Sequence, residues 1–577
     1  MSNPSYLSLG STARALVPNR WDLVALLVIL GGLALAAIGV HQAQVPLESI
    51  QQTTVTLDPS NLPDYALRTT LRMLGAMVGS LAFTFIYGAL AAKSRHLELV
   101  LIPILDILQS VPVLGYISFT VVFFMSLFPG RVLGAELACM FAIWTSQVWN
   151  MTFSFYQSLR TLPLDLEEVS RSFRFSAWQR FWRLEVPFSM PGLIWNMMMS
   201  MSGGWFFVVA SEAITVGDTT ITLPGIGAYV ATAIQEKNLI AIGWGLVTMT
   251  VVIVLYDILL FRPLVAWSDK FRSELTAGQL VPESFFLDII RRTRFLGTIT
   301  LPIRRAFGAT LRLRAPSRTI ALPRLPVPSK LVDGVWYVIV IAGAAYCGWQ
   351  LVQYVTTTLG WADLLEAAKL TVFTMIRVIV LIALASLVWV PIGVWIGLRP
   401  GWTAKVQPLA QFLAAFPANL MFPVAVVMIV KYSLNAEIWV GPLMILGTQW
   451  YILFNVIAGA SAFPNDLKEA ATNFRIRNWQ WWRTVMLPGI FPYFVTGAIT
   501  ASGGAWNASI VSEYFHIGDQ TLQTIGLGAQ ISASSDSGNF STLLLATVLM
   551  ASIVVTMNRL VWRRLYRLAE TRYKLEG

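Results

Sequence analysis

Charged residues are scarce in this chain of 577 residues. Asp, Glu, Lys and Arg together make up 12% of it, whereas hydrophobic residues make up 56%. That charged share is about half of what an ordinary soluble domain carries. A surface that meets water needs charge, so most of this surface is expected to meet lipid. The composition excludes a soluble globular domain and predicts an integral membrane protein.

Cysteine and histidine are also rare. The two cysteines, Cys139 and Cys347, both lie in apolar runs, which argues against a disulfide framework. The three histidines, His41, His96 and His516, are scattered singly and predict no metal site. The phosphate-loop pattern GxxxxGK[ST] does not occur. We therefore expect no enzyme activity, no metal and no cofactor in this chain itself.

Long apolar runs are abundant. A run of about 18 residues or more can cross a bilayer as a helix, and runs with an internal proline are expected to be kinked or broken. The sequence predicts an all-α polytopic membrane protein with about twelve membrane helices, six on each side of a polar middle. They are expected at residues 22–41, 68–92, 99–127, 133–157, 187–211, 239–262, 333–355, 369–398, 407–431, 437–461, 488–512 and 541–562.

Basic residues next to these runs gather in alternate loops. Residues 41–67 and 513–540 contain no Lys or Arg, whereas residues 263–332 contain 12 Lys or Arg against 4 Asp or Glu. Because loops rich in base stay on the cytoplasmic side, we expect both chain termini and the basic middle segment to be cytoplasmic. We expect four parts: residues 1–67 with the first span and an outer loop, a first core at 68–262, a linker at 263–332, and a second half at 333–577.

The two halves repeat one another. An offset of 301 holds without a gap from residue 163 to residue 228, and an offset of 305 holds upstream of it. The matched pairs include Glu168/Glu469, Phe173/Phe474, Arg174/Arg475, Trp178/Trp479, Glu212/Glu513, Arg72/Arg377, Pro103/Pro408 and Pro112/Pro417. Both copies place a polar segment (residues 163–192 and 464–489) on the same membrane face, so the repeats are parallel and their pseudo-twofold axis follows the membrane normal.

The polar segments cannot cross the membrane. Residues 164–184 contain seven charged side chains, and each costs about 2.5–3.5 kcal/mol near the centre of a membrane helix. One interpretation is a helix at the lipid headgroups. The other is an element that docks into a partner protein. Because the Glu, Phe, Arg and Trp positions are duplicated, we favour docking.

Two motifs resemble those of a known family. The sequence EAA at residues 469–471, followed by LP at 487–488, resembles the cytoplasmic EAA loop of ABC importer permeases. EVS at 168–170, followed by VP at 186–187, is a weaker copy. SGGAWNASIVSEYF from residue 502 and SGGWFFVVASEAI from residue 202 are similar to permeases of the nitrate/sulfonate/taurine type. The chain thus resembles two such permease domains fused in one polypeptide.

This resemblance implies a function. It implies a type I ABC importer fold that moves a small solute, expected to be an anion, into the cell by alternating access across the bacterial inner membrane. It implies two separate cytoplasmic ATPase subunits that bind ATP and Mg²⁺, an extracytoplasmic substrate-binding protein, and no nucleic acid. The residues implied to couple to the ATPases are Glu168, Phe173, Arg174, Trp178, Glu469, Phe474, Arg475 and Trp479.

One position departs from the family pattern. The family usually has Gly shortly after EAA, where it ends a short helix, and this chain has Arg174 and Arg475 there. Arginine makes a left-handed helix cap more costly than glycine does. We therefore expect each docking helix to run on or to turn differently.

The fifth helix of each half carries paired glycines beside a tryptophan. Gly203, Gly204, Trp205, Gly503, Gly504 and Trp506 either allow close helix packing or line the transport pathway, with Trp as a gate. Arg72 and Arg377, near the outer ends of the second helices, either attract an anionic substrate or pair with Glu212 and Glu513, and we favour the pairing.

The main alternative is a secondary transporter with parallel repeats, driven by an ion gradient. It predicts ionisable residues in the middle of the membrane. The spans contain few such residues, chiefly Arg72, Arg377, Asp106, Glu136 and Asp257, and all of them lie nearer a span end than its middle. We therefore favour the importer.

Overall fold

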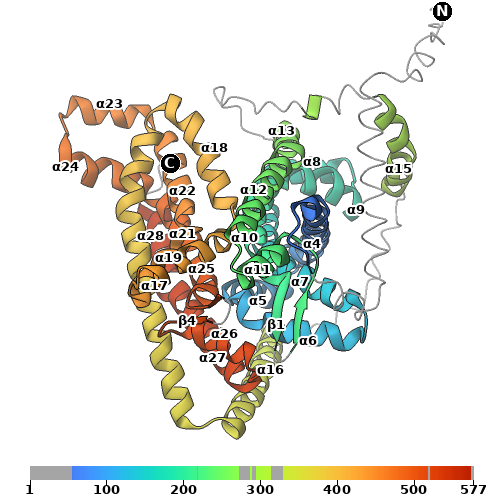
Figure 1. Ribbon diagram of the computed structural model, residues 1–577. Coiled ribbons are helices and arrows are strands. Elements are labelled where there is room, and N and C mark those ends of the chain that lie inside the picture. Colours follow the sequence, from blue (N-terminus) through green and yellow to red (C-terminus); the bar gives the residue numbers. More distant parts are fainter. Residues whose placement is uncertain are drawn as a thin grey trace, which may run out of the picture.

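The computed structural model describes residues 55–216, 219–271, 286–288, 294–312, 329–517 and 520–572. The expected first span at 22–41 lies outside these residues. Within them, seven helical segments are long and apolar enough to cross a membrane, and three bent helix pairs raise that number to ten. The expected all-α polytopic architecture is confirmed, and the helices fall into two halves (Figure 1).

The first half and the linker contain these elements: η1 (Pro59–Asn61), α4 (Leu62–Lys93), α5 (Arg95–Ser110), α6 (Val113–Leu127), α7 (Val132–Arg160), α8 (Leu164–Ser172), α9 (Ala177–Arg180), η2 (Phe181–Glu185), α10 (Val186–Ser211), β1 (Ala213–Val216), β2 (Thr219–Thr222), α11 (Ile226–Gln235), α12 (Leu239–Tyr256), η3 (Asp257–Phe261), α13 (Arg262–Ser268), η4 (Asp269–Phe271) and α15 (Arg294–Arg312).

The second half follows the same order: α16 (Ser329–Thr358), α17 (Trp361–Gly397), α18 (Pro400–Ala415), η5 (Ala418–Met421), α19 (Phe422–Lys431), α20 (Ala436–Trp439), α21 (Gly441–Leu446), α22 (Gln449–Ser461), α23 (Asn465–Asn473), α24 (Asn478–Trp481), η6 (Trp482–Met486), α25 (Leu487–Ser512), β3 (Tyr514–Ile517), β4 (Gln520–Gln523), α26 (Leu527–Asp536), α27 (Phe540–Met557), η7 (Asn558–Trp562) and α28 (Arg563–Arg572).

Two of the expected spans are broken at a proline. The α5–α6 pair bends by 102° and the α18–α19 pair by 78°. A residue before proline is driven out of the helical region by the proline ring. Val111, before Pro112, has ψ 124°, and Phe416, before Pro417, has ψ 129°. The matched prolines therefore place the same bend in each half.

The repeats are parallel in the structure. Figure 1 shows α8 and α9 at the same end of the molecule as α23 and α24, with β1 and β4 away from that end. The hairpins also match at an offset of 301, because Ala213 pairs with Thr222 in the first and Tyr514 pairs with Gln523 in the second. Each hairpin lies between the fifth helix of its half and a short helix.

Each broken helix contacts the fifth helix of the other half. The backbone N–H of Val113, just after the first break, donates to Asn507 Oδ1 on α25 at 2.8 Å. Asn419, just after the second break, donates from Nδ2 to the carbonyl of Phe206 on α10 at 3.1 Å. Residues 206 and 507 differ by the repeat offset of 301. The halves are therefore joined by a pseudo-symmetric exchange of contacts.

A π-helical turn precedes the fifth helix in each half. η2 and η6 occupy matched positions, directly before Pro187 and Pro488. Proline lacks the N–H that would bond four residues back, and its ring clashes with that carbonyl. A wider turn removes this clash. The proline thus accounts for the wider turn before each fifth helix.

The glycines of α25 differ in how tightly they pack. A methyl group at Gly504 would lie 2.3 Å from Thr448 Cγ2, whereas a methyl group at Gly503 would meet no atom within 4 Å. Gly204 of α10 is tight as well, because a methyl group there would lie 2.7 Å from Gln147 Nε2. Close helix packing therefore accounts for Gly204 and Gly504.

We expect Gly504→Ala to destabilise the protein and Gly503→Ala to leave its stability unchanged or slightly raised. Overpacking a well-filled site costs about 1–3 kcal/mol, whereas alanine in an open helical site is favoured over glycine. The measurement is the thermal unfolding midpoint of each purified variant. Thr448→Ser should restore part of the loss in Gly504→Ala, and equal midpoints for the two alanine variants would contradict this packing.

Candidate functional site

A buried arginine faces two glutamates in the first half. Arg72 on α4 donates from Nη1 to Glu212 Oε1 at 2.7 Å, and from Nη2 and Nε to both oxygens of Glu136 at 2.6 and 2.7 Å. The arginine side chain is 4% exposed and the Glu212 side chain is fully buried. The favoured pairing of Arg72 with Glu212 is confirmed.

The same cluster occurs in the second half. Arg377 on α17 donates to Glu513 Oε1 at 2.5 Å and to Glu437 Oε2 at 2.8 Å. Glu437 stands 301 residues after Glu136, so both carboxylates are repeated. The pairing of Arg377 with Glu513 is confirmed as well.

A threonine completes each cluster. Thr69 Oγ1 donates to Glu212 at 2.7 Å and accepts from the N–H of Ile226 at 3.0 Å. Thr374 is placed in the same way, because its hydroxyl bonds to Glu513 and accepts from the N–H of Leu527 at 2.9 Å. Each cluster therefore ties the hairpin-side ends of the second and fifth helices to the short helix after the hairpin.

Sequence reasoning missed part of these clusters. Glu136 was noted only as a charge near a span end, and Glu437, Thr69 and Thr374 were not considered. A signal was available, because 136/437 follows the offset of 301 and 69/374 follows the offset of 305. Repeated polar residues in apolar helices would have identified all of them.

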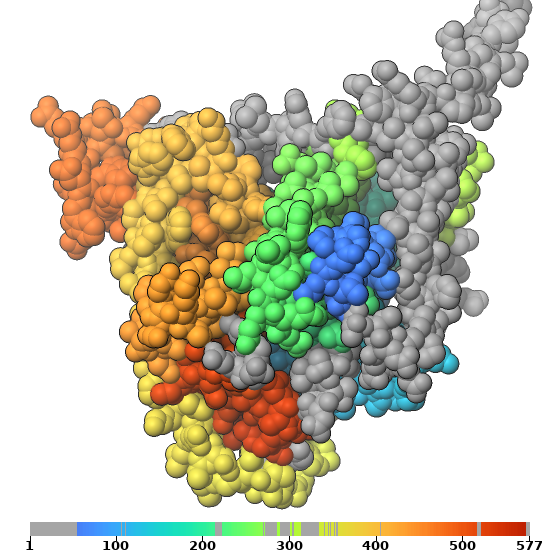
Figure 2. Space-filling model, viewed as in Figure 1, coloured from blue at the N-terminus to red at the C-terminus, as the bar shows by residue number. Residues whose placement is uncertain are grey.

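The polar segments form short helix–turn–helix units. α8 and α9 build the first, and α23 and α24 build the second. In the space-filling view the second unit (orange, upper left) stands out from the body of the molecule (Figure 2). Glu168 and Glu469 are exposed on these units. The prediction that these segments do not cross the membrane agrees with this arrangement.

The expectation that arginine would prolong or redirect the docking helix is wrong. α8 ends at Ser172 and α23 at Asn473, and Arg174 and Arg475 adopt left-handed φ angles of 50° and 52°. A left-handed non-glycine residue costs roughly 1–2 kcal/mol. Backbone bonds of the Schellman type offset this cost: Phe175 N–H to the Ser170 carbonyl (3.1 Å) and Ile476 N–H to the Ala471 carbonyl (2.9 Å).

Large aromatic side chains are exposed at the turns. Phe173 is 68% exposed and Phe474 is 80% exposed, and Trp479 on α24 is 71% exposed. Exposed aromatic residues on a polar unit are typical of a protein interface. The structure thus brings Glu168, Phe173 and Arg174 onto one unit, and Glu469, Phe474, Arg475 and Trp479 onto the other.

An ion-pair chain anchors the first unit. Arg180 Nη2 lies 2.9 Å from Glu167, and its Nε lies 3.1 Å from Glu185. Glu185 is buried and also pairs with Lys93 at the end of α4, at 2.7 Å. The Arg180 guanidinium holds the pKa of the Glu167 carboxyl below its usual value. At the matched position 486 the second unit has a buried methionine.

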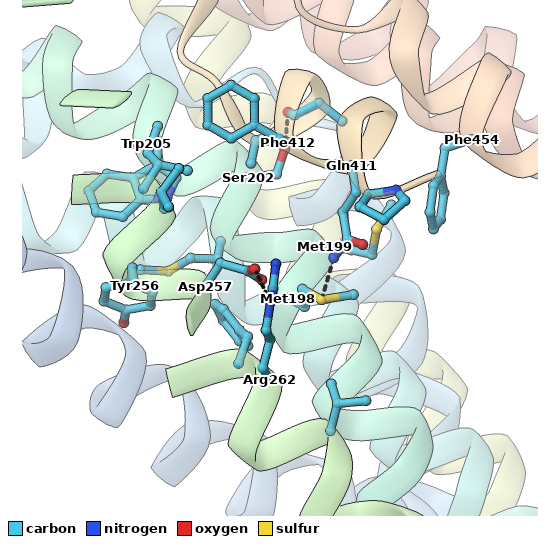
Figure 3. A pocket seen from close by; sticks show the side chains of 18 of the residues that line it. Met198, Met199, Ser202, Trp205, Tyr256, Asp257, Arg262, Gln411, Phe412 and Phe454 are labelled. Carbon is cyan, nitrogen blue, oxygen red and sulfur yellow. Dashed lines mark hydrogen bonds and ion pairs between the residues drawn. The ribbon is translucent and has the colours of Figure 1, made fainter. Parts of the chain in front are cut away.

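Three cavities lie along the boundary between the halves. The first, of about 590 Å³, lies between α10 and α12 of one half and α18 of the other, and Figure 3 shows its lining, with the Asp257–Arg262 ion pair (2.9 Å) among the labelled side chains. The second, of about 80 Å³, lies between α10 and α25 and is lined by Gly203, Gly504 and Asn507. The third, of about 310 Å³, lies on the hairpin side, between α11 and α26.

A hydrogen-bonded contact separates the first two cavities. Ser202 Oγ on α10 bonds to Tyr451 Oη on α22 at 2.6 Å and to the carbonyl of Ala414 on α18. All three residues line both cavities. The contact joins the two halves, and sequence reasoning did not identify it, although Ser202 opens the SGG motif.

The two predicted pathway tryptophans occupy different positions. Trp205 is buried and lines the first cavity, where it meets Tyr256 edge-on at 5.5 Å between ring centroids. Trp506 is buried in the core of the second half. Within the part of the chain that the structure describes, no group of three or more His, Cys, Asp or Glu side chains could hold a metal ion.

Comparisons with known proteins agree with the division of the chain into two repeated halves. The model of the family described as "Binding-protein-dependent transport system inner membrane component" matches residues 84–272 and again 389–574. The bicarbonate transport system permease protein CmpB of Synechococcus elongatus is 26% identical over 191 residues, which is 33% of this chain and 66% of that protein.

Two further relatives are similarly distant. The nitrate import permease protein NrtB of Leptolyngbya laminosa is 25% identical over 32% of this chain and 63% of its own length. The glycine betaine/carnitine transport permease protein GbuB of Listeria monocytogenes is 28% identical over 32% of this chain and 60% of its own length. In each case the match spans just under two thirds of the relative.

We expect Arg72→Met to destabilise the protein strongly, because it leaves Glu136 and Glu212 without their cation. Breaking a buried ion pair in this way costs about 3–5 kcal/mol. Arg68→Met on the same helix is the control, since its pair with Asp64 is half-exposed and such pairs contribute about 0–1 kcal/mol. Thermal unfolding of the purified variants measures both, and equal losses would argue against a special role of the buried cluster.

Proposed function

The chain belongs to the family of binding-protein-dependent transport system inner membrane components, and from this premise we propose that it is the membrane-spanning subunit of an ATP-driven importer. A small solute crosses between the two halves by alternating access. ATP and Mg²⁺ are used by two separate cytoplasmic ATPase subunits, and an extracytoplasmic binding protein delivers the solute. This chain transports and does not itself catalyse a reaction.

One observation carries the proposal. Two exposed helix–turn–helix units, each with a left-handed arginine and an aromatic tip, stand at the same end of the molecule. Each continues through a π-helical turn into the fifth helix of its half. A rigid-body movement of either unit is therefore passed directly to a helix at the boundary between the halves. The two units are therefore suited to bind ATPase subunits outside the membrane.

The orientation follows from the charge of the loops. We propose that the chain lies in the bacterial inner membrane, with both termini and both docking units in the cytoplasm. The basic linker and the lack of Lys and Arg at 513–540 support this. The hairpins would then face the binding protein.

The three cavities suggest where the solute passes. We propose a path from the outer cavity, through the small central cavity beside Gly203 and Gly504, into the larger inner cavity. The Ser202–Tyr451 contact closes this path between the central and inner cavities. Arg72 and Arg377 do not contact the solute in this proposal, because each already faces two carboxylates and an anion would be repelled there.

The class of solute is proposed from the relatives. Bicarbonate and nitrate are anions, and the names of two relatives carry them. A third relative is named for betaine and carnitine, which are zwitterions. We therefore propose a small solute that carries a negative charge.

The first test is co-purification of the ATPase subunits. Glu168→Lys combined with Glu469→Lys should abolish co-purification, because both carboxylates are exposed on the docking units. Glu236→Lys, exposed near the hairpins, is the matched control and should retain the ATPase. The docking role is refuted if the double variant still carries its full complement of ATPase.

The second test concerns the closed path. Tyr451→Ala removes the ring and hydroxyl that separate the central and inner cavities, so we expect nitrate to leak from loaded proteoliposomes without ATP. Tyr451→Phe keeps the ring and should leak less. Tyr432→Ala, at an exposed tyrosine, is the control. Vesicles with Tyr451→Ala that stay as tight as the wild type would contradict the proposed path.

A further inference from the structure

The linker packs against the first docking unit. α15, the linker helix, makes three contacts with α9 and η2. Gln179 donates from Nε2 to the carbonyl of Leu311 at 2.7 Å. Trp178 donates from Nε1 to Thr310 Oγ1 at 3.4 Å. The rings of Trp182 and Phe307 meet edge-on, with 5.2 Å between their centroids. Figure 1 shows α15 beside α9.

These contacts come from one face of the linker helix. Phe307, Thr310 and Leu311 are three or four residues apart and therefore share a helix face. Arg305 and Arg312 are exposed. The linker helix thus turns an apolar face to the docking unit and keeps arginines on its surface.

Among the residues that the structure describes, no linker helix covers the second docking unit. Trp479 and Gln480 occupy the positions of Trp178 and Gln179, and in the described part of the chain their side chains make no hydrogen bond or ring contact with another segment. Trp479 is 71% exposed, whereas Trp178 is 47% exposed. The two units are therefore equal in backbone but unequal in the surface that they offer.

The ion-pair chain adds to this inequality. Glu167, Arg180, Glu185 and Lys93 brace the first unit against α4. The second unit has Trp481 and Met486 in place of Arg180 and Glu185, so the ion pairs of Arg180 with Glu167 and Glu185 are not repeated there. The first unit is thus held from two sides, by α4 and by the linker helix.

We propose that the two docking surfaces are unequal, the first being a composite of α8, α9 and the linker helix α15, and the second being formed by α23 and α24 without the linker helix. This rests on the proposed docking of ATPase subunits. The ATPase subunit that binds the exposed side of Trp178 also contacts Thr310 and the exposed Arg305 and Arg312. The linker helix therefore forms part of its interface. The other subunit meets α23 and α24, beside which Arg572 of α28 lies. The repeated sequence thus presents one partner with the linker helix α15 as a further contact.

The first arm of the test uses the protein alone, in lipid nanodiscs, and follows backbone amide exchange. Phe307→Glu places a charge against Trp182 and should speed exchange in residues 177–185 by roughly fivefold, the loss expected for one aromatic contact. Arg305→Glu, on an exposed side chain of the same helix, should not. Exchange in residues 478–486 should stay unchanged and reports intact folding. Equal exchange in wild type and Phe307→Glu would overturn the packing.

The second arm adds the ATPase subunits and places a photo-cross-linking amino acid at position 173, 312 or 474 in turn. All three positions should capture an ATPase subunit, and Phe307→Glu should lower capture at 312 by roughly fivefold without affecting 474. Capture at 173 and 474 but not at 312 would overturn the composite surface and leave the proposed function intact. No capture at 173 or 474 would instead refute the docking of ATPase subunits itself.

Discussion

Each half of this protein depends on one arginine held between two glutamates. A charge inside an apolar helix bundle is stable only when it is paired, and Arg72 and Arg377 each pair with two carboxylates. The clusters tie the second, fourth and fifth helices together near the hairpin end. Each cluster fixes one end of its fifth helix, while the other end of that helix continues into a docking unit.

Much of the fold could be predicted from sequence because the bilayer imposes a simple rule. Helices must be long and apolar, so the spans around α4, α7 and α25 were correctly placed. Internal prolines predicted kinked or broken runs, and the chain does break at Pro112 and Pro417, although it stays helical through Pro103 and Pro408. The pairing of Arg72 with Glu212 followed from charge in an apolar setting. These features are determined by local chemistry and by the lipid that surrounds the helices.

Other features depend on tertiary context, and prediction failed there. The left-handed turn at Arg174 was not expected, because the intrinsic cost of arginine was weighed without the backbone bonds that offset it. The contact of Ser202 with Tyr451 joins residues about half a chain apart, and no pattern in either segment indicates it. The packing of the linker helix on Trp178 and Gln179 is of the same kind. Propensity is a weak prior wherever distant segments meet.

The exchange of contacts at the broken helices has a consequence for how such a chain evolves. Val113 reaches Asn507 in the other half, and Asn419 reaches Phe206 in return, so neither half completes its own interior. Joining both on one polypeptide guarantees that a first half always meets a second half, at a high local concentration. Pairs of two first halves, or of two second halves, therefore do not compete with the pair of unlike halves. Substitutions in one copy, such as glutamate at 185 against methionine at 486, can then accumulate without any need to work in a symmetric pair.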